Sequence, residues 1–566
     1  MPNDYTVIQS PNLRRVPRLA HRLDRVLFSP GVHYLQDPRS RVYNFDPFLR
    51  NITEPDHFDY DAIAPYITSS RDAELVALAK AYKRRFVGST SSMTHMLSHL
   101  WYNVSSWRQA DISPLSIAFA DMPRSQTTTM RAPASVFLRS MPGSTGIYAI
   151  DADKSFDVRE TVLSLLGRSM EKLLTSSQKE YEECLKANKK QRTNAVQEVP
   201  QYVYAKMDDF ILRAQIDCYD PRLPRPTFDI KTRACISVRL DAANHKDNWG
   251  YQIHQQHGLL ESYEREYYDM IRAAFLKYSF QARIGNMDGV MVTYHNTARV
   301  FGFQYVSVDE MDARLNGNRL TGDMTFSIIM KLFRSILSAV VRDAAPGRTL
   351  LVTFDSRMAE RELHVYVEDV GDYTATRSAY DSDLALSTNG EQSDRNSDPF
   401  GSDANQTSSD PFSSPASATA TTTAAASGTP SMTSALPRVT KYVVAMYSTV
   451  DGKDTDQPVT LNPDCKINDV DWHVNVLITR LDSTSPEFIA RQYRSVRRRQ
   501  LAIFGADGTD DQGSDDTNVD VSTDGDSSGR NRLRETLRKI SRRGLHLNEE
   551  KSRHPVIYKP FVTKPN

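Results

Sequence analysis

Apolar residues recur at helical spacing in several stretches of this chain. Intervals of three and four residues predict helices over 71–108, where Gly88 separates two of them, and over 158–176. The same periodicity predicts a long helix near 260–284 and a strongly apolar helix over 324–342. These segments supply apolar faces that must pack against something else, so we expect a layered fold.

Short runs rich in valine, isoleucine, phenylalanine and tyrosine lie between and after these helices and predict strands. They read YVYAKM, FILRAQIDC and TFDIKTRACISVRL, then GVMVTY and RVFGFQYVSV, and later KYVVAMYSTV and WHVNVLITRL. His295-Asn296-Thr297 joins two of these runs and suits a hairpin. Ser485-Pro486 resembles an N-cap followed by proline and predicts a final helix rich in arginine. The mixture predicts an α/β protein.

Two long stretches lack either pattern. Residues 401–437 contain 24 Ser, Thr or Ala in 37 positions and no basic residue, and residues 505–529 contain eight Asp and no base. Such segments bury too little apolar surface to offset their chain entropy, so we expect disordered linkers over 374–437 and 505–529. The hydrophobic content of 39% for the 566-residue chain agrees with partial disorder.

Charge is distributed unevenly along the chain. The formal net charge is zero, but 374–437 carries −5 and 505–529 carries −8, so the other 477 residues carry +13. A basic folded part favours a polyanionic partner, although solvated surface charge is an equal alternative.

Several classes of protein are disfavoured by what the sequence lacks. No run approaches the roughly 18 consecutive apolar residues of a spanning helix. The four cysteines form no CxxC pair, which disfavours a structural zinc site. The chain contains no GxxxxGK[ST], GxSxG or GxGxxG motif, which disfavours nucleotide hydrolases, serine hydrolases and dinucleotide enzymes.

Three carboxylates and a lysine fall in order on a predicted helix–strand–strand unit. Glu171 lies in the amphipathic helix, Asp217 ends one apolar strand, and Asp229-Ile230-Lys231 lies inside the next. Asp229 and Lys231 are two apart on a strand, so both side chains project to one face. Converging carboxylates suit a hard cation such as Mg²⁺.

This set is the one required for metal-assisted phosphodiester cleavage, because the cation polarises the phosphate and lowers the pKa of water. The bare Asp/Glu-x-Lys pattern also occurs at 451–453, 464–466 and 549–551, in turn-like or polar contexts without an upstream strand aspartate. The alternative interpretation of 229–231 is a solvent-facing charge pair on an edge strand, and the pattern alone leaves both open.

The order of Glu171, Asp217, Asp229 and Lys231 resembles the PD-(D/E)XK nuclease superfamily. Longer blocks, roughly over 17–345, resemble the fungal mitochondrial Pet-type RNA-processing and RNA-degradation proteins. Examples are VYNFDPFLRNI, GSTSSMTHMLSH, RAPASVFLR, YAIDADKSFD, EREYYDMIRAAFLKYSFQARIGNMDG and YHNTARVFGFQY. The resemblance implies a restriction-endonuclease-like mixed sheet flanked by helices, with a helical N-terminal elaboration and disordered insertions.

Composition, the predicted elements and the resemblance together divide the chain into seven parts. They are a basic N-terminal segment (1–30), a helical N-terminal elaboration (31–154), a nuclease-like core with the following helix and strand (155–373), a disordered linker (374–437), strands with a basic helix (438–504), an acidic disordered linker (505–529) and a basic C-terminal tail (530–566). Because the resemblance starts near residue 17, little room is left for a targeting presequence. We therefore expect either a truncated start or a different targeting route.

The function implied by the resemblance is a 5′-to-3′ exoribonuclease that uses Mg²⁺ or Mn²⁺. It would act in mitochondrial RNA 5′-end processing and RNA degradation. Asp217 and Asp229 would hold the metal, Glu171 would do so directly or through water, and Lys231 would orient the attacking water. The implied partners are RNA, the surface of the mitochondrial inner membrane, and the mitochondrial transcription or RNA-degradation machinery.

Other residues are weaker candidates. Arg233, Lys277 and Gln281 could bind substrate, with packing or an exposed polar face as the alternative. We interpret His95 and His99, four apart on a helix, as packed histidines and not as metal ligands. The arginines of 491–499 and 530–543 could hold an RNA backbone or an anionic membrane surface.

Two other function classes remain open. Because fold does not imply function, the chain could be a non-hydrolytic RNA-binding or transcription-regulatory factor on a nuclease-like scaffold. A DNA endonuclease would use the same four residues. The complete set of three carboxylates and a lysine argues against a scaffold that has lost its activity.

Overall fold

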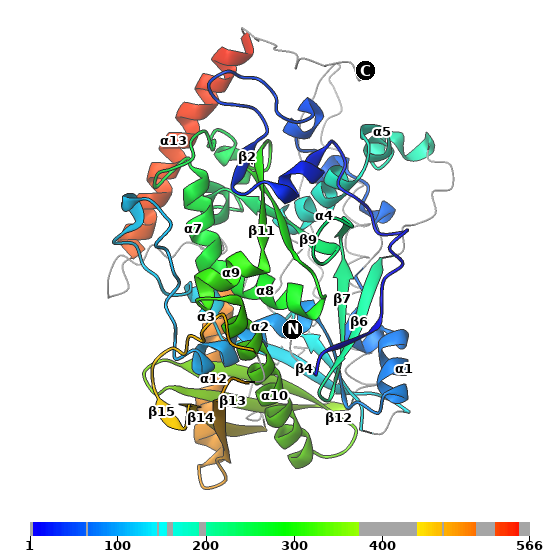
Figure 1. The fold of residues 1–566 in the computed structure, drawn as a ribbon, viewed down its shortest axis with the longest axis vertical. Coiled ribbons are helices and arrows are strands. Elements are labelled where there is room, and N and C mark those ends of the chain that lie inside the picture. Colours follow the sequence, from blue (N-terminus) through cyan, green and yellow to red (C-terminus); the bar gives the residue numbers. More distant parts are fainter. Residues whose placement is uncertain are drawn as a thin grey trace, which may run out of the picture.

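Two β-sheets organise the part of the chain that the computed structural model describes (Figure 1). The described residues are 4–63, 66–143, 146–155, 162–191, 200–372, 438–466, 469–504 and 527–553. The predicted linker 374–437 and most of the predicted linker 505–529 therefore lie outside the described residues. Within the described part, the chain is a mixed α/β protein with mixed sheets, as the sequence predicts.

The larger sheet has 11 strands in the order β1-β6-β7-β3-β5-β4-β12-β13-β14-β15, and β16 also pairs with β14. Their bounds are β1 Thr6–Gln9, β3 Phe86–Ser89, β4 Ala134–Ser140, β5 Tyr148–Ala152, β6 Gln201–Met207, β7 Phe210–Ile216, β12 Arg348–Arg357, β13 Glu362–Asp372, β14 Val439–Val450, β15 Lys453–Thr455 and β16 Trp472–Arg480. β3 runs parallel to both β5 and β7, whereas β12, β13 and β14 form an antiparallel run.

The smaller sheet has five strands in the order β2-β11-β10-β9-β8. Their bounds are β2 Val32–Tyr34, β8 Cys218–Tyr219, β9 Thr227–Ala234, β10 Gly289–His295 and β11 Val300–Ser307. β9 and β10 are parallel, with Lys231 opposite Val292, and β10 and β11 form the predicted antiparallel hairpin. Only Asp217 separates β7 of the larger sheet from β8 of the smaller one, so the chain passes between the sheets at that residue.

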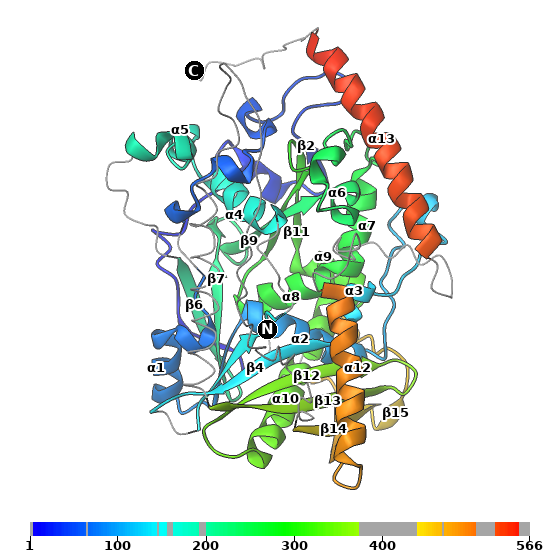
Figure 2. The same cartoon turned by 180° about the vertical axis from the view of Figure 1, so that it is seen from behind.

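Helices cover both faces of the larger sheet. Their bounds are α1 Ala73–Ala81, α2 Thr90–Val104, α3 Thr128–Arg131, α4 Val162–Thr175, α5 Gln178–Glu182, α6 Ile236–Leu240, α7 Tyr263–Ala273, α8 Phe275–Ile284, α9 Val308–Leu315, α10 Arg319–Asp343, α12 Pro486–Phe504 and α13 Ser527–Arg553. α2 and α10 pack together against one face of the β12–β14 region. α12 packs on the other face of this region (Figure 2). The ring centroids of Tyr493 on α12 and Tyr366 on β13 are 5.8 Å apart.

The position of α4 follows from its apolar stripe. Leu166, Met170 and Leu173 are buried in a core cluster shared with Phe228 and Ile230 of β9. Because these positions recur at intervals of three and four, they lie on one helical face. That face anchors α4 across β9 and leaves Glu171, next to Met170, at the side of the packed stripe.

The prediction that 31–154 is a helical elaboration is wrong. α1 and α2 lie where helices are predicted. However, the same segment also contains β2, a strand of the smaller sheet, and β3, β4 and β5, strands of the larger sheet. Phe86 of β3 pairs with Phe210 of β7 and with Tyr148 of β5. These partners are distant in sequence, so local periodicity does not reveal the strands.

Three predicted elements also have different boundaries. The run TFDIKTRACISVRL continues as a strand only to Ala234, after which Ile236–Leu240 is helix α6. The helix predicted near 260–284 is two helices, since Ala274 has φ −129° and ψ −39° between α7 and α8. The basic segment beyond 530 belongs to α13, which begins at Ser527 and packs against α6.

One described helix, α10, is long and apolar enough by composition to cross a membrane. Its most apolar window has a mean hydropathy of 1.6, and 56% of that window is buried within the fold. Ile329, Phe333 and Leu337 belong to the main hydrophobic core with residues of α2 and β12. Core helices of globular proteins have the same composition.

Candidate active site

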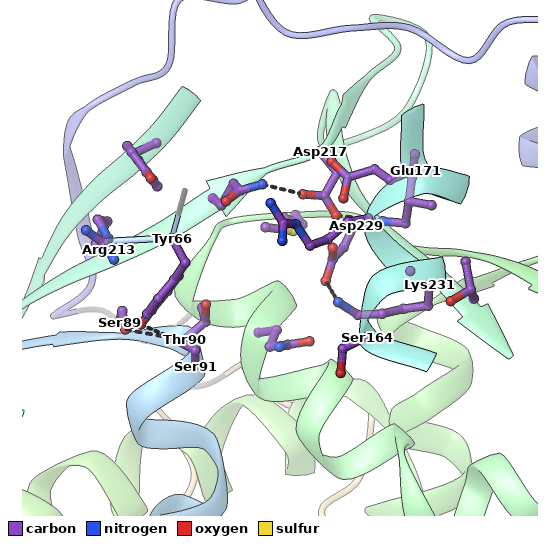
Figure 3. Close-up of a pocket in the computed structure, with 18 residues that line it drawn as sticks. Tyr66, Ser89, Thr90, Ser91, Ser164, Glu171, Arg213, Asp217, Asp229 and Lys231 are labelled. Carbon is purple, nitrogen blue, oxygen red and sulfur yellow. Dashed lines mark hydrogen bonds and ion pairs between the residues drawn. The ribbon is translucent and has the colours of Figure 1, made fainter. Parts of the chain in front are cut away.

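A pocket of about 370 Å³ lies beside the junction of the two sheets. α4, β7, β9, α8 and the start of α2 contribute to its walls. Glu171, Asp217, Asp229 and Lys231, which the sequence places in order along the chain, all line it (Figure 3). The tertiary fold therefore brings these four side chains to one cavity.

Asp217 is fixed where the chain leaves the larger sheet. Its Oδ2 accepts a hydrogen bond from the backbone N–H of Ile230 at 3.0 Å. Its Oδ1 accepts a longer bond from Gln215 Nε2 at 3.4 Å. The bond to Ile230 ties the end of β7 to β9, so the carboxyl of Asp217 is held next to that of Asp229.

Asp229 and Lys231 form an ion pair on one face of β9. The Nζ of Lys231 lies 2.6 Å from Oδ2 of Asp229 and 5.5 Å from the ring centroid of Tyr278. Burial disfavours the charged lysine, but the carboxylates of Asp229 and Asp217 outweigh burial and raise the pKa of Lys231. The lysine is therefore a permanent cation in the pocket.

The pKa values of the two aspartates are shifted in opposite directions. Burial, the charge of Glu171 and the charge of Asp229 raise the pKa of Asp217 well above its usual range. Burial also acts on Asp229, but Lys231 and hydrogen bonds to Asp217 and Ile230 outweigh it and lower its pKa. Ionisation is therefore favoured at Asp229 over Asp217.

The donor set suits a hard divalent cation. Three carboxylates line one pocket, and such oxygens are the ligands that Mg²⁺ prefers. Burial and the neighbouring charges of Glu171 and Asp229 disfavour the ionised form of Asp217, and a cation in the pocket would offset that effect. Asp217, Asp229 and Glu171 are the residues that could hold it.

The weaker candidates are placed differently. Gln281 lines the pocket. Arg233 is buried outside it, with Nε 3.9 Å from Glu266 Oε2 in a cluster of buried charges. Lys277 is not among the residues that line the pocket, and its charge acts on His95 and His99.

The two histidines of α2 are packed inside the protein, as the sequence interpretation holds. His99 is fully buried, with Nε2 2.9 Å from the carbonyl oxygen of Ala132 and Nδ1 accepting from the backbone N–H of Ser356 at 3.2 Å. This arrangement specifies one neutral tautomer. Burial lowers the pKa of His95 well below its usual value and that of His99 to about 4.

Another group of possible ligand atoms lies in the turn after β12 and on the first residues of β13. Glu360, Glu362 and His364 place one ligand atom each within 4.8 Å of one another. Glu360 is exposed, and Arg357 and Lys441 lie nearby with positive charge. Exposed acidic groups of this kind are common without an ion, so we propose no metal site there.

The pocket wall that faces the carboxylates consists of residues that the sequence pattern does not single out. Tyr66, Ser89, Thr90, Ser91 and Arg213 line this wall (Figure 3). The hydroxyl residues start α2, and Ser89 forms a capping box with Ser92. The run GSTSS is a recognisable helix-start signal, but nothing in the local sequence indicates that this start faces Asp229.

The sequence of this chain is similar to those of known proteins. Residues 66–338 match the family model described as mitochondrial protein Pet127. The chain is 39% identical over 320 residues to a putative mitochondrial translation system component PET127 of Saccharomyces cerevisiae, covering 53% of this chain but 38% of that protein. The chain thus spans well under half the length of that relative.

A second relative is covered more fully. The mitochondrial mRNA degradation protein pet127 of Schizosaccharomyces pombe is 34% identical over 367 residues, or 63% of this chain and 69% of that protein. Among solved structures, Rai1 of Scheffersomyces stipitis, in complex with (3′-NADP)⁺ and a calcium ion, gives a TM-score of 0.30 at 11% identity, covering 62% of this chain and 82% of Rai1. That overlap is too low to support an argument. The sequence matches show that the chain belongs to the Pet127 family of mitochondrial proteins.

Proposed function

We propose that this protein is a divalent-metal-dependent exoribonuclease that hydrolyses RNA from the 5′ end. The observation that carries the proposal is the convergence of Glu171, Asp217, Asp229 and Lys231 on one pocket. With α5, β8, α6 and α7 left out, the chain order of α4, β6, β7, β9, α8 and β10 resembles the αβββαβ order of PD-(D/E)XK nucleases, although β6 and β7 lie in the larger sheet and β9 and β10 in the smaller one. We therefore propose that these elements form a restriction-endonuclease-like core.

In this proposal Asp217 and Asp229 hold Mg²⁺ or Mn²⁺, with Glu171 as a third ligand directly or through water. The bound cation supplies Lewis-acid polarisation of the scissile phosphate and lowers the pKa of water. Lys231 orients the attacking water and neutralises charge that develops on the phosphate. The oxygen of water bonds to phosphorus and the water gives up one proton to solvent. The bond from phosphorus to the leaving sugar oxygen breaks, and that oxygen takes up one proton from solvent, so the protons balance.

RNA as the substrate is supported by the name of the Schizosaccharomyces pombe relative, an mRNA degradation protein. The 5′-to-3′ direction and a role in mitochondrial 5′-end processing and RNA degradation rest on the family resemblance. The basic balance of the chain outside its acidic segments suits a polyanion. Mitochondrial transcription or RNA-degradation machinery belongs to the same proposal as a partner.

Peripheral association with the mitochondrial inner membrane is part of the proposal. Of the arginines on α12, Arg497 and Arg499 form ion pairs with Asp153 and Asp355. Arg491, Arg494 and Arg498 are exposed and remain available to anionic lipid headgroups. Sedimentation with anionic vesicles, compared with neutral ones, tests this part, and equal recovery from both would reject it.

The decisive experiment uses purified full-length protein, Mg²⁺ and 5′-monophosphorylated RNA labelled separately at each end. We expect progressive loss from the 5′ end in the wild type, and no turnover but retained RNA binding in Asp229→Ala and Lys231→Ala. A matched control is Asp464→Ala, because Asp464 starts the same Asp-x-Lys pattern in an exposed loop. This variant should keep wild-type activity.

A readout independent of activity is the melting temperature with and without Mg²⁺ or Mn²⁺. A ligand that binds only the folded state raises the Tm, so the wild type should gain stability and Asp229→Ala should not. Tight RNA binding with no hydrolysis in either metal would reject the enzyme and favour a non-hydrolytic regulatory factor. Equal cleavage of DNA and RNA of one sequence would favour a DNA endonuclease.

A further inference from the structure

An aromatic side chain forms part of the pocket wall that faces the carboxylates. Tyr66 lies on the opposite side of the pocket from Asp217, Asp229 and Glu171 (Figure 3). Its side chain is 51% exposed, although tyrosines of this protein such as Tyr263 and Tyr294 are fully buried. The ring of Tyr66 therefore offers apolar surface to whatever enters the pocket.

The orientation of this ring is fixed by its hydroxyl. Tyr66 Oη lies 2.6 Å from Ser91 Oγ and 3.4 Å from Ser89 Oγ, at the start of α2. Ser89 is buried and is tied into the capping box of α2. The ring is consequently held at the pocket before any ligand arrives, which lowers the entropic cost of stacking on it.

Cations lie near the same ring. The ammonium of Lys154 is 5.5 Å and the guanidinium of Arg213 is 6.0 Å from the ring centroid of Tyr66. Arg213 is itself immobilised, since it pairs with Asp72 at 2.6 Å and donates to the carbonyl oxygen of Ile67 at 2.5 Å. An aromatic ring flanked by cations suits a ligand that carries both an aromatic base and phosphates.

The size of the pocket limits what can stack there. Pockets for small ligands enclose about 300–1,000 Å³, and this cavity of about 370 Å³ is at the lower end. Its two walls together carry hydroxyls, an aromatic ring, cations and the carboxylates. This combination matches one nucleotide whose phosphate lies towards Asp229 and whose base lies towards Tyr66.

We infer that Tyr66 is a stacking platform for the base of the terminal nucleotide of the RNA, the one that hydrolysis releases. The inference rests on the proposed function, because an enzyme that removes one nucleotide at a time must hold that nucleotide beside the cleaved bond. Every base has a π-face, so the platform accepts any sequence. It requires an unpaired base, so the substrate class is RNA with a single-stranded end.

The test combines changes in the protein with changes in the RNA. Binding is measured by fluorescence anisotropy in the Asp229→Ala background, so that the RNA survives. The RNAs are 5′-monophosphorylated strands that are intact, abasic at the terminal nucleotide, or abasic at an internal nucleotide as a control. The proteins carry Tyr66, Tyr66→Phe or Tyr66→Leu.

We expect Tyr66→Leu to weaken binding of intact RNA by about 5- to 150-fold, the range of base stacking on an aromatic side chain. Tyr66→Phe should stay within about threefold of wild type, because the ring remains. Removing the terminal base should weaken binding to the Tyr66 protein by a similar factor and have little effect on Tyr66→Leu.

Two results would overturn the inference. One is an equal penalty for the terminal abasic site in the Tyr66 and Tyr66→Leu proteins, which would mean that the base lies elsewhere. The other is equal weakness of the Phe and Leu variants, which would assign the effect to the hydroxyl. Failure of the proposed function would look different, since wild-type protein would then leave RNA uncleaved while binding still depended on Tyr66 and the terminal base.

Discussion

Asp217 is a carboxylate of the pocket whose ionised form is disfavoured. It is buried, it lies near the charges of Glu171 and Asp229, and its pKa is raised accordingly. Asp229 differs because Lys231 balances it at 2.6 Å. The two aspartates therefore contribute to stability with opposite signs, even though we propose that both bind the same metal.

Asp217→Asn should raise the free energy of unfolding at pH 7.5 without divalent ions, by on the order of 1 kcal/mol. The change removes a disfavoured charge and keeps an acceptor for the N–H of Ile230. Asp229→Asn should lower stability, because it removes the carboxylate that lies 2.6 Å from Lys231 Nζ. Urea unfolding checks both, RNA hydrolysis should be lost in both, and a stability change of the same sign in the two variants would contradict the argument.

His99 predicts a dependence of stability on pH. The unfolded chain binds a proton with a pKa near 6.5, whereas burial lowers the pKa of folded His99 to about 4. The unfolded state therefore binds more protons in this window, so stability falls as pH decreases from about 6.5 to 4, by roughly 3 kcal/mol for this group.

Urea unfolding at pH 7.5 and pH 5 checks this contribution against His99→Gln. The variant should be less stable at pH 7.5, since the bonds to Ala132 and Ser356 are disturbed, but it should lose less stability on acidification. His295, which is buried, and His95, which is partly buried, also have lowered pKa values, so the comparison is between the two slopes. Equal slopes would show that His99 is not held neutral.

At the scale of elements, helix α13 packs closely against the backbone at Gly250, and its own Gly544 lies at this contact. A Cβ on Gly544 would collide with the backbone of Gly250, and a Cβ on Gly250 would collide with the backbone of Ser541. Ser541 Oγ donates to the carbonyl oxygen of Asp247 at 2.7 Å, and Arg538 pairs with Asp241 at 2.6 Å. The close approach allows these polar contacts to form.

Gly544→Ala should detach α13 even though alanine favours helix over glycine by about 1 kcal/mol. We expect faster proteolysis and faster hydrogen exchange in 527–553, with little change in exchange of the sheet core. Thr536→Ala, at an exposed position of the same helix, is the matched control. Unchanged protection in Gly544→Ala would mean that the two backbones are not in contact in solution.

At the scale of the whole molecule, side chains of α12 contact segments that are far apart in sequence. Arg497 pairs at 2.7 Å with Asp153, whose side chain is 2% exposed, and also donates to Ser135 Oγ at 3.1 Å. Tyr493 packs on Tyr366 of β13. The strands before the predicted linker 374–437 and the helix after it therefore share one packed structure.

Arg497→Ala should lower the free energy of unfolding by about 3–5 kcal/mol, because it leaves a buried carboxylate without its partner. Its neighbour Arg498 is exposed, and Arg498→Ala should cost less than about 0.5 kcal/mol. Chemical denaturation followed by fluorescence and by circular dichroism measures both. Similar small losses in the two variants would show that α12 is not fastened through Asp153.

Much of the element pattern was predictable because helices and hairpins are specified by near neighbours. The apolar stripe of α4, the β10–β11 hairpin and the proline that opens α12 are local features, and the structure has all three where the sequence predicts them. β3 and β5 were not predictable in this way, since their partners lie far along the chain. The break between α7 and α8 at Ala274 was likewise not predictable from near neighbours, because it depends on how the two helices pack.

The sequence alone determined that Glu171 lies on an amphipathic helix and that Asp229 and Lys231 share one face of a strand. Spacing along a helix or a strand decides which side chains share a face. Only the tertiary structure decided which groups oppose them. Arg233, two residues beyond Lys231 on the same strand, is buried with Glu266 outside the pocket, whereas Tyr66 and Ser91 come from other elements to form its far wall. Contacts of this kind depend on how sheets and helices pack, and local periodicity carries no information about them.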